Sequence, residues 1–277
     1  MKVKDIKTLM HLLNLNGPKK RFGQNFLLDE SALNDIVKAA DLKKDDQVLE
    51  IGPGLGVLSM KLAPAVEKLV LVELDRDLAG FLRVQFANNE AVTVCEEDAL
   101  QADWEKYFEG QYKIVANIPY NITGMLFRKI SLLLKKPERV VLLVQKEVAE
   151  RLISKSGDMN VLALVMQFLY KIKIVRKVSR MGFYPAPKVD SAVILLERRF
   201  DYEQQWQSYG LENKDFFQLV KIGFSAKRKK LSNNLANGYH KSADWAQKLM
   251  DKAELADNTR AEDVAMEDWL RMGAGMS

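Results

Sequence analysis

The 277-residue chain predicts an α/β fold, in which a parallel sheet is covered by helices on both faces and is followed by a smaller all-helical C-terminal domain. Short apolar runs alternate with segments of helical periodicity between residues 30 and 150. The runs are continuous rather than alternating in polarity, which is typical of parallel strands that are buried on both faces. Beyond Phe200 the strand runs end and helical periodicity continues, so we expect a domain boundary near residue 200.

The first predicted elements are a helix and a strand that ends in glycines. The segment DESALNDIVKAADL has an acidic cap region, followed by Leu33, Ile36, Val37 and Ala40 at helical spacing. The segment QVLEIGPGLG then predicts a strand that leads into a tight turn. Further along we predict a helix at 57–66, a strand at 68–75, a helix at 76–89, strands at 91–100 and 112–120, and a strand that runs into a helix at 138–152.

The following segments differ in pattern. Residues 160–170 are apolar and compatible with a helix, whereas residues 171–178 (KIKIVRKV) alternate with period two. Together with SAVILLERR they predict an antiparallel pair added late to the sheet. The segments that begin at Lys214, Ser242 and Arg260 have helical period, so the C-terminal domain should be all-helical.

The composition argues against disulfide-rich, metal-binding and membrane proteins. A single cysteine excludes a disulfide framework and a multi-cysteine zinc site, and the two separated histidines argue against a histidine metal site, so we expect no metal. No apolar stretch approaches the ~20 residues that span a bilayer. The basic N-terminus is a poor signal peptide because its apolar part is short and interrupted. We therefore expect a cytoplasmic protein without membrane contact.

Positive charge gathers in two runs. The net charge is +5, and residues 1–21 hold six basic residues against one acid. Residues 221–230 hold five basic residues and no acid. One such run is typical of a solvated face, but two distant runs favour a positive surface for a polyanion such as nucleic acid.

The glycine turn has the features of a nucleotide site. Gly52, Gly54 and Gly56 would let backbone N–H groups approach a ligand at a helix N-terminus. Glu73 ends the next strand about 20 residues further on, where an acid binds a ribose, and Asp75 is a second candidate. A dehydrogenase also fits this spacing, but the G-x-G-x-G pattern and an Asp98 placed to bond an adenine amine argue against it.

The stretch ANIPYNITG ends the strand at 112–120. Its plain interpretation is a proline turn with a partly buried tyrosine. At the carboxyl end of a strand in this fold, however, the Asn117 amide oxygen and the Ile118 carbonyl could accept the hydrogens of an aromatic amine. Pro119 would stiffen the turn, and Tyr120 would offer a face on which an extruded base stacks. Phe183, beside a proline-rich loop, could clamp the other face, and Lys188 could touch a phosphate, although a surface turn with a core Phe explains the pattern equally well.

Eight segments occur in the order found in one family: KKRFGQNFLLD, LEIGPGLG, LVELD, EEDAL, NIPYNIT, FYPAPKVDSAV, KRKKLSNNL and RAEDV. From about residue 19 to about residue 270 the chain resembles the KsgA/RsmA family of small-subunit ribosomal RNA adenine dimethyltransferases. The resemblance implies a Rossmann-like sheet that binds S-adenosylmethionine. It also implies dimethylation of the 6-amino groups of two adjacent adenines in the 3′-terminal hairpin of small-subunit (16S) rRNA, with a role in subunit biogenesis.

The resemblance assigns the site residues by position. The cofactor residues are Gln24, Asn25, Leu27, Gly52, Gly54, Glu73, Asp98, Ala99 and Asn117. The residues that hold the target base are Asn117, Ile118, Pro119, Tyr120 and Phe183. The residues expected to bind RNA are Lys19, Lys20, Arg21, Lys188, Lys227, Arg228, Lys229 and Lys230. The domains are then a basic extension at 1–18 without an assigned role, a catalytic domain at 19–200 and an RNA-binding helical domain at 201–277.

Three alternatives stay open at this stage. The erythromycin-resistance methylases share the cofactor loop and the Asn-x-Pro-Tyr turn, but RFGQNFL and the long tail favour the small-subunit enzyme. A non-catalytic assembly factor would not need Asn117 or Glu73, and a dehydrogenase is more distant. We expect a monomer whose partner is small-subunit rRNA or the assembling small subunit.

Overall fold

The computed structural model describes residues 6, 8, 10, 11 and 17–276 of the chain. Contacts divide the chain into two compact units. One comprises Met1–Ala149 and Lys173–Glu197, and the other comprises Glu150–Ile172 and Arg198–Ser277. Residues 150–172 thus group with the C-terminal helices, although the sequence pattern placed them in the 19–200 domain. The functional boundaries remain a prediction.

A seven-stranded sheet forms the centre of the first unit, in the order β4-β3-β2-β5-β6-β9-β7. Strands β2 to β6 pair in parallel, and β9 runs antiparallel to β6, which confirms the predicted parallel sheet with a late antiparallel addition. The strands are β2 (Gln47–Ile51), β3 (Lys68–Glu73), β4 (Val92–Glu96), β5 (Lys113–Asn117), β6 (Arg139–Gln145), β7 (Tyr170–Val178) and β9 (Ser191–Arg198).

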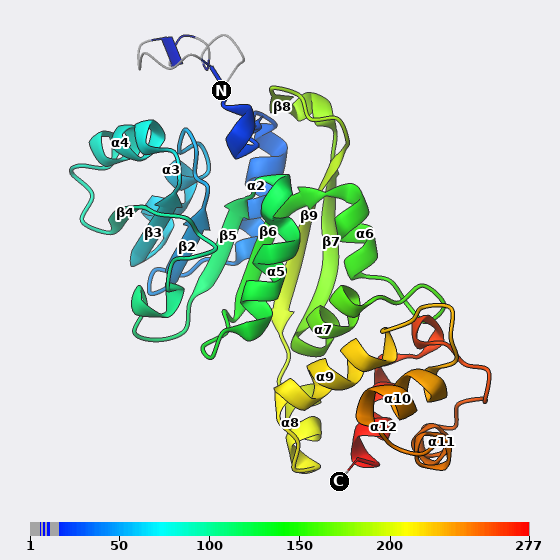
Figure 1. Ribbon diagram of the computed structural model, residues 1–277. Helices are drawn as coiled ribbons and strands as arrows, with labels where there is room; N and C mark the ends of the chain where they lie inside the picture. The colour runs from blue at the N-terminus through cyan, green and yellow to red at the C-terminus, as the bar shows by residue number, and fades with distance from the viewer. Residues whose placement is uncertain (1–5, 7, 9, 12–16, 277) are drawn as a thin grey trace. The chain divides into compact units, whose positions relative to one another are not determined.

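Helices cover both faces of this sheet, because alternate strand residues bury apolar side chains on each side. Val48, Leu69 and Val141 pack with α2 in one core cluster, whereas Leu49 and Ile114 are fully buried outside it. In Figure 1 α5 lies in front of the sheet and α2 behind it. The α-helices of this part are α2 (Glu30–Ala40), α3 (Ser59–Leu62), α4 (Arg76–Gln85) and α5 (Thr123–Leu132), and α6 (Lys146–Leu152) runs from this unit into the second.

Short elements complete the first unit. β1 (Phe26–Leu27) pairs antiparallel with β8 (Phe183–Tyr184) in a separate two-stranded sheet. This pairing brings the segment after residue 17 beside a loop far away in sequence. The 3₁₀ turns are η1 (Lys20–Phe22), η2 (Ala63–Ala65), η3 (Trp104–Lys106), η4 (Tyr120–Ile122) and η5 (Arg180–Gly182).

The second unit is helical and has an aromatic core. Phe168 stacks on Phe216 with ring centroids 4.0 Å apart, and the Trp206 ring meets Phe216 edge-on at 5.2 Å. Such pairs contribute beyond the area they bury. Its elements are α7 (Val161–Leu169), α8 (Asp201–Ser208), α9 (Asn213–Gly223), α10 (Leu231–Tyr239), α11 (Ala243–Lys252), η6 (Ala261–Asp263) and α12 (Met266–Ala274).

A membrane-crossing segment is not found in the part of the chain that the structure describes, since none of its helices combines the necessary length with the necessary hydropathy.

Candidate active site

A cavity opens at the carboxyl ends of β2, β3 and β5, where ligands bind in open α/β sheets. It brings together segments that are widely separated in the sequence: residues 21–27, the glycine turn, the end of β3, residues 97–99 and the turn after β5. The predicted site residues that line it are Gln24, Asn25, Leu27, Gly52, Gly54, Glu73, Asp98, Ala99, Asn117, Ile118, Pro119 and Tyr120.

The glycine turn follows β2 directly and needs the left-handed backbone region. Gly52 has φ 64° and Gly54 has φ 61°, values that residues with a Cβ adopt only with strain. A Cβ at Gly54 would also lie 3.1 Å from the ring of Phe26. Glycine therefore lets the backbone form part of the cavity wall while Phe26 packs closely on it.

Glu73 is the last residue of β3, and only 6% of it is exposed. Its Oε2 accepts a hydrogen bond from Gly54 N at 3.0 Å and its Oε1 accepts one from Asp75 N at 2.9 Å. Burial raises the pKa of this carboxyl, although the two backbone N–H donors oppose the rise. Glu73 thus joins the glycine turn to the start of α4, at the place predicted for a ribose contact.

Glu50 lines the site but was not among the residues predicted from the sequence. It lies in β2 two residues before Gly52, lines the cavity and is 2% exposed. Burial raises its pKa to about 8, and the Glu73 carboxylate acts in the same direction. The segment LEIGPGLG carries a signal for this residue, because an acid lies two positions before Gly52 in an otherwise apolar strand.

Residues 97–99 form the wall after β4. Asp98 is half-buried, and its Oδ1 accepts a hydrogen bond from Leu100 N at 2.9 Å. The Ala99 carbonyl accepts the indole N–H of the fully buried Trp104 at 2.9 Å. These bonds fix the loop that was predicted to bind the adenine of the cofactor.

Asn117 ends β5, and its amide has a defined orientation. Its Nδ2 donates to the carbonyl of Asn25 at 3.1 Å. Among the described residues no hydrogen bond reaches its Oδ1, so this oxygen is free to accept from a ligand. Gly23 lies against the same turn, since a Cβ there would be 3.4 Å from Pro119 Cβ. The N-terminal segment therefore holds the Asn-Ile-Pro-Tyr turn.

The two predicted aromatic residues are placed differently. Tyr120 lines the cavity, and its hydroxyl lies 2.5 Å from the Ser191 hydroxyl at the start of β9, which fixes the ring. Burial raises its pKa. Phe183 is only 4% exposed, pairs with Leu27 and belongs to the core cluster beneath the sheet face. The structure does not bring Phe183 into the cavity, and its stacking role remains a prediction.

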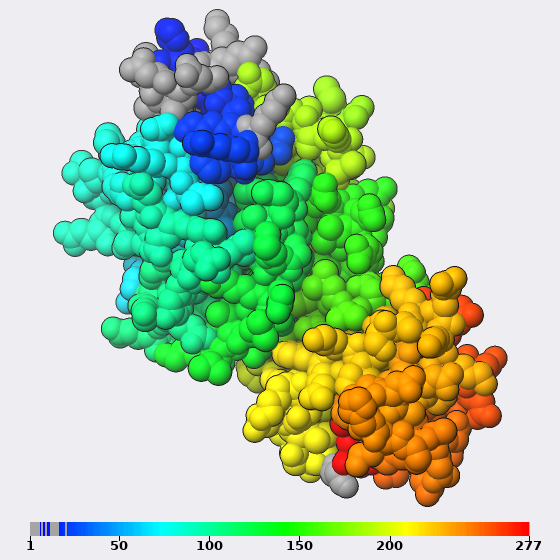
Figure 2. Space-filling model, viewed as in Figure 1, coloured from blue at the N-terminus to red at the C-terminus, as the bar shows by residue number. Residues whose placement is uncertain are grey.

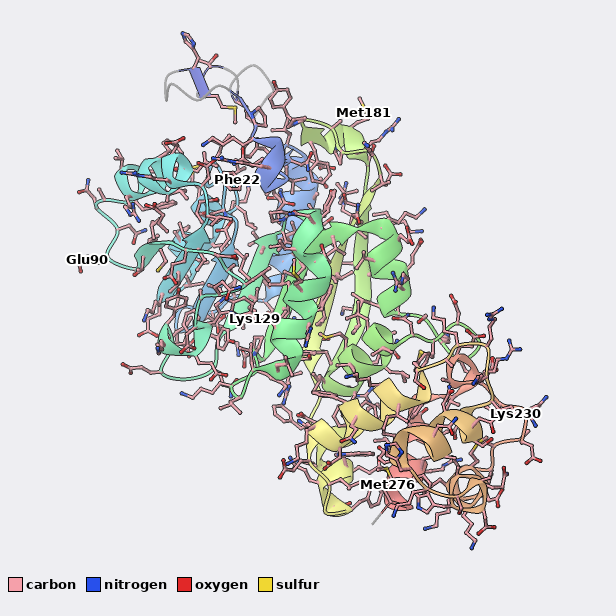
Figure 3. All side chains as sticks on the ribbon, viewed as in Figure 1. Phe22, Glu90, Lys129, Met181, Lys230 and Met276 are labelled. Atoms are coloured by element: carbon pink, nitrogen blue, oxygen red, sulfur yellow. The ribbon has the colours of Figure 1, made fainter. Side chains whose placement is uncertain are left out.

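The predicted RNA-binding residues fall into several places. Lys227, Arg228, Lys229 and Lys230 are exposed between α9 and α10, and the labelled Lys230 points outward in Figure 3. Arg21 and Lys188 are exposed in the first unit, whereas Lys19 forms ion pairs with Asp75 and Asp77, both at 2.7 Å. The side chain of Lys20 lies outside the described residues.

Phe22 also lines the cavity and was not predicted. The guanidinium of Arg21 lies over its ring, 4.6 Å from the centroid. Figure 3 labels Phe22 near the start of the N-terminal segment of the first unit, close to the ends of the strands. Its position depends on how the N-terminal segment folds over the cavity. That path could not be predicted from the spacing of residues in the sequence.

Comparisons with known proteins agree on the kind of enzyme. The model of a family described as "Ribosomal RNA adenine dimethylase" matches residues 15–275. Proteins named "Ribosomal RNA small subunit methyltransferase A" from Nostoc sp. and Synechococcus elongatus are 40% and 41% identical, and the matches span 92% and 91% of this chain and 96% and 92% of theirs.

Solved structures give the same fold. A dimethyladenosine transferase from Plasmodium falciparum has a TM-score of 0.76 at 24% identity and covers 89% of this chain and 95% of its own. The 23S rRNA methyltransferase ErmE has a TM-score of 0.72 at 26% identity and covers 90% of this chain and 98% of its own. Because the family model matches nearly the whole chain, this protein is a member of the ribosomal RNA adenine dimethylase family.

Proposed function

We propose that this protein transfers methyl groups from S-adenosylmethionine to the 6-amino groups of two adjacent adenines in the 3′-terminal hairpin of small-subunit rRNA. The observation that carries the proposal is the Asn117 amide. Its N–H₂ group is bound to the Asn25 carbonyl, and its oxygen is left as an acceptor beside a nucleotide-type cavity.

The cavity fits the cofactor chemically. S-adenosylmethionine supplies a methyl group that is activated by a positively charged sulfur. The glycine turn offers close backbone approach for its amino-acid part, and Glu73 offers a carboxylate for its ribose. Asp98 and Ala99 line the same cavity, and we assign them to recognition of its adenine.

The chemical difficulty lies in the amine, whose lone pair is delocalised into the ring. Acceptors that hold its two hydrogens favour a pyramidal nitrogen and stabilise the charge that develops on it. The Asn117 Oδ1 and the Ile118 carbonyl supply two such acceptors in the turn after β5. As the nitrogen bonds to the methyl carbon, the carbon–sulfur bond breaks with its electron pair going to sulfur, and the nitrogen then releases a proton to water.

The alternative substrate is an adenine of large-subunit rRNA, since the fold also matches ErmE at 26% identity. The small-subunit assignment is supported by relatives that are about 40% identical and carry a small-subunit name. The two hypotheses predict methylation of different rRNAs.

Primer extension tests whether the substrate is small-subunit or large-subunit rRNA. Ribosomal RNA from a strain that lacks the activity is incubated with the protein and the cofactor, either as free RNA or as small subunits. We expect two adjacent stops near the 3′ end of the small-subunit rRNA. Stops in large-subunit rRNA alone would refute the assignment.

Asn117→Ala tests the role of the amide. We expect at least a hundredfold loss of methyl transfer, which is in the range for removal of one such electrostatic contact, with RNA affinity changed less than twofold. Asn88→Ala, in an exposed turn between α4 and β4, is the matched control. Unchanged transfer of tritiated methyl by Asn117→Ala would disprove the role.

We also place the protein in the cytoplasm and assign it a monomeric state, in keeping with a ribosomal substrate. Fractionation of cells and light scattering of the purified protein test these two assignments.

A further inference from the structure

Residues 19–25, which we call the strap, lie across the cofactor cavity, and residues 21–25 form part of its lining. In Figure 2 the blue residues of this part of the chain lie between the cyan surface around α4 and the yellow-green surface around β8. From the sequence, Lys19 was expected to bind RNA, and Asp75 was a second candidate for the ribose contact. Neither assignment explains how the two residues are placed.

Asp75 uses both carboxylate oxygens within the protein. Its Oδ1 accepts from Lys19 Nζ at 2.7 Å and from Asp77 N at 3.2 Å, where it caps α4. Its Oδ2 accepts from Gln24 Nε2 at 2.8 Å. Gln24 in turn accepts from the backbone N–H of Lys19 at 2.8 Å, so that both ends of the strap meet one carboxylate.

The Asp75 side chain is only 3% exposed, and the Lys19 side chain is 27% exposed. A buried carboxylate without a charged partner destabilises the folded protein. Loss of the Lys19 ammonium from Asp75 would therefore be strongly unfavourable. Hydrogen bonds between charged groups are also stronger than neutral ones. The closed strap is therefore the arrangement in which the Asp75 charge is best compensated.

Asp75 also connects the strap to the cofactor residues. Its backbone N–H donates to Glu73 Oε1, and Glu73 Oε2 accepts from Gly54 N. Phe26, which follows the strap directly, packs its ring on Gly54. Movement of the strap would thus disturb the acid and the glycine turn that are assigned to the cofactor.

A small apolar cluster reinforces this closure from outside. It joins Ile6 and Met10 of the N-terminal extension to Phe26, to Leu55 of the glycine turn and to Leu78 of α4. Ile6 is fully buried, and Met10 is 4% exposed. Both lie outside the family match, which begins at residue 15. Within the extension, Ile6 and Met10 thus have a packing role that the sequence pattern did not reveal.

We infer that Asp75 is a positioning residue that holds the strap closed over the cofactor site through Lys19 and Gln24. This inference rests on the proposed cofactor and deepens that assignment. Closure slows the escape of the bound cofactor, and Lys19 serves retention of the cofactor rather than RNA binding.

The test measures dissociation of S-adenosylhomocysteine from the immobilised full-length protein by surface plasmon resonance. Lys19→Met and Asp75→Asn should raise the dissociation rate about tenfold. Lys19→Arg keeps the charge and should stay within about threefold of wild type. The matched control is Asp77→Asn, because Asp77 binds the same ammonium at 2.7 Å but has a 57% exposed side chain. It should change the rate less than twofold.

Two further readouts separate closure from general stability and from RNA binding. If S-adenosylhomocysteine dissociates from Lys19→Met at the wild-type rate, the inference is overturned, whether or not the melting temperature of this variant is lower. If Asp75→Asn does not fold, Lys19→Met alone tests whether the strap retains the cofactor. The slope of rRNA affinity against salt should stay at the wild-type value in Lys19→Met, whereas a slope smaller by about one would restore a phosphate contact. Failure of the wild type to bind S-adenosylhomocysteine would overturn the cofactor assignment and the strap with it.

Discussion

Glu50→Gln should stabilise the protein at alkaline pH and change its stability by less than about 1 kcal/mol near pH 5. Glu50 is 2% exposed, and its Oε2 has no hydrogen-bond partner among the described residues. Burial raises its pKa from 4.5 to about 8. Between these values the folded protein keeps a proton that the unfolded chain has released, so the free energy of unfolding falls as pH rises.

The size of the effect follows from that interval. Each pH unit between 4.5 and 8 lowers the free energy of unfolding of the wild type by about 1.4 kcal/mol. The accumulated loss is about 2 kcal/mol at pH 6 and about 5 kcal/mol above pH 8, where both states have lost the proton. Glutamine has no proton to release and does not suffer this loss.

Guanidinium unfolding of the wild type and Glu50→Gln at pH 5, 7 and 9 checks the prediction. Glu90→Gln is the control, because Glu90 is exposed in the turn before β4 and is labelled at the outer edge of its unit in Figure 3. As pH rises, the free energy of unfolding of Glu50→Gln should increasingly exceed the values for the wild type and Glu90→Gln. Parallel curves for all three proteins would refute the argument that burial keeps this acid neutral.

Two further predictions concern binding. Glu73→Ala should raise the dissociation constant for S-adenosylmethionine at least tenfold, because it removes the predicted ribose contact and two backbone hydrogen bonds; calorimetry that finds unaltered affinity would contradict the assignment. Replacing Arg228, Lys229 and Lys230 together by Gln should weaken rRNA binding and reduce its salt slope by about two to three, since each phosphate contact contributes about 0.7–0.9 to the slope. A wild-type slope would show that this exposed segment is a solvated face.

The order and type of the sheet elements could be predicted because the signal is local. The runs that became β3, β5 and β6 are continuously apolar, as buried parallel strands require, and the run of β2 is interrupted only by Glu50. Residues 160–170 were undecided, because a helix that is apolar on most sides lacks a periodic pattern, and they form α7. The pairing of β1 with β8 was not predicted, since two-residue strands have no period to detect.

The position of a site residue could be predicted from the sequence where that residue lies at the end of its own strand. Gly52, Glu73 and Asn117 each lie at the end of a strand, and parallel strands bring these ends to one edge. Lys19 and Phe183 could not be placed in this way, because tertiary contacts direct one to Asp75 and bury the other. The sequence placed Glu73 first and Asp75 second for the ribose; in the structure Glu73 lines the cavity, whereas Asp75 is not part of its lining and binds Lys19 and Gln24.

The strap contacts both the cofactor cavity and the Asn117 amide that is proposed to bind the target amine. The segment proposed to close the cofactor cavity also supplies the Asn25 carbonyl, which accepts a hydrogen bond from the Asn117 N–H₂ group and so fixes the orientation of the amide. An aspartate at position 117 would place a carboxylate oxygen against that carbonyl, so the amide is required for its donor as well as for its acceptor. If one closure both retains the cofactor and orients the amide, as proposed, an open strap would present the target amine with a disordered acceptor. If the strap closes as proposed, the acceptor proposed for the target amine is ordered only while the strap covers the cofactor site.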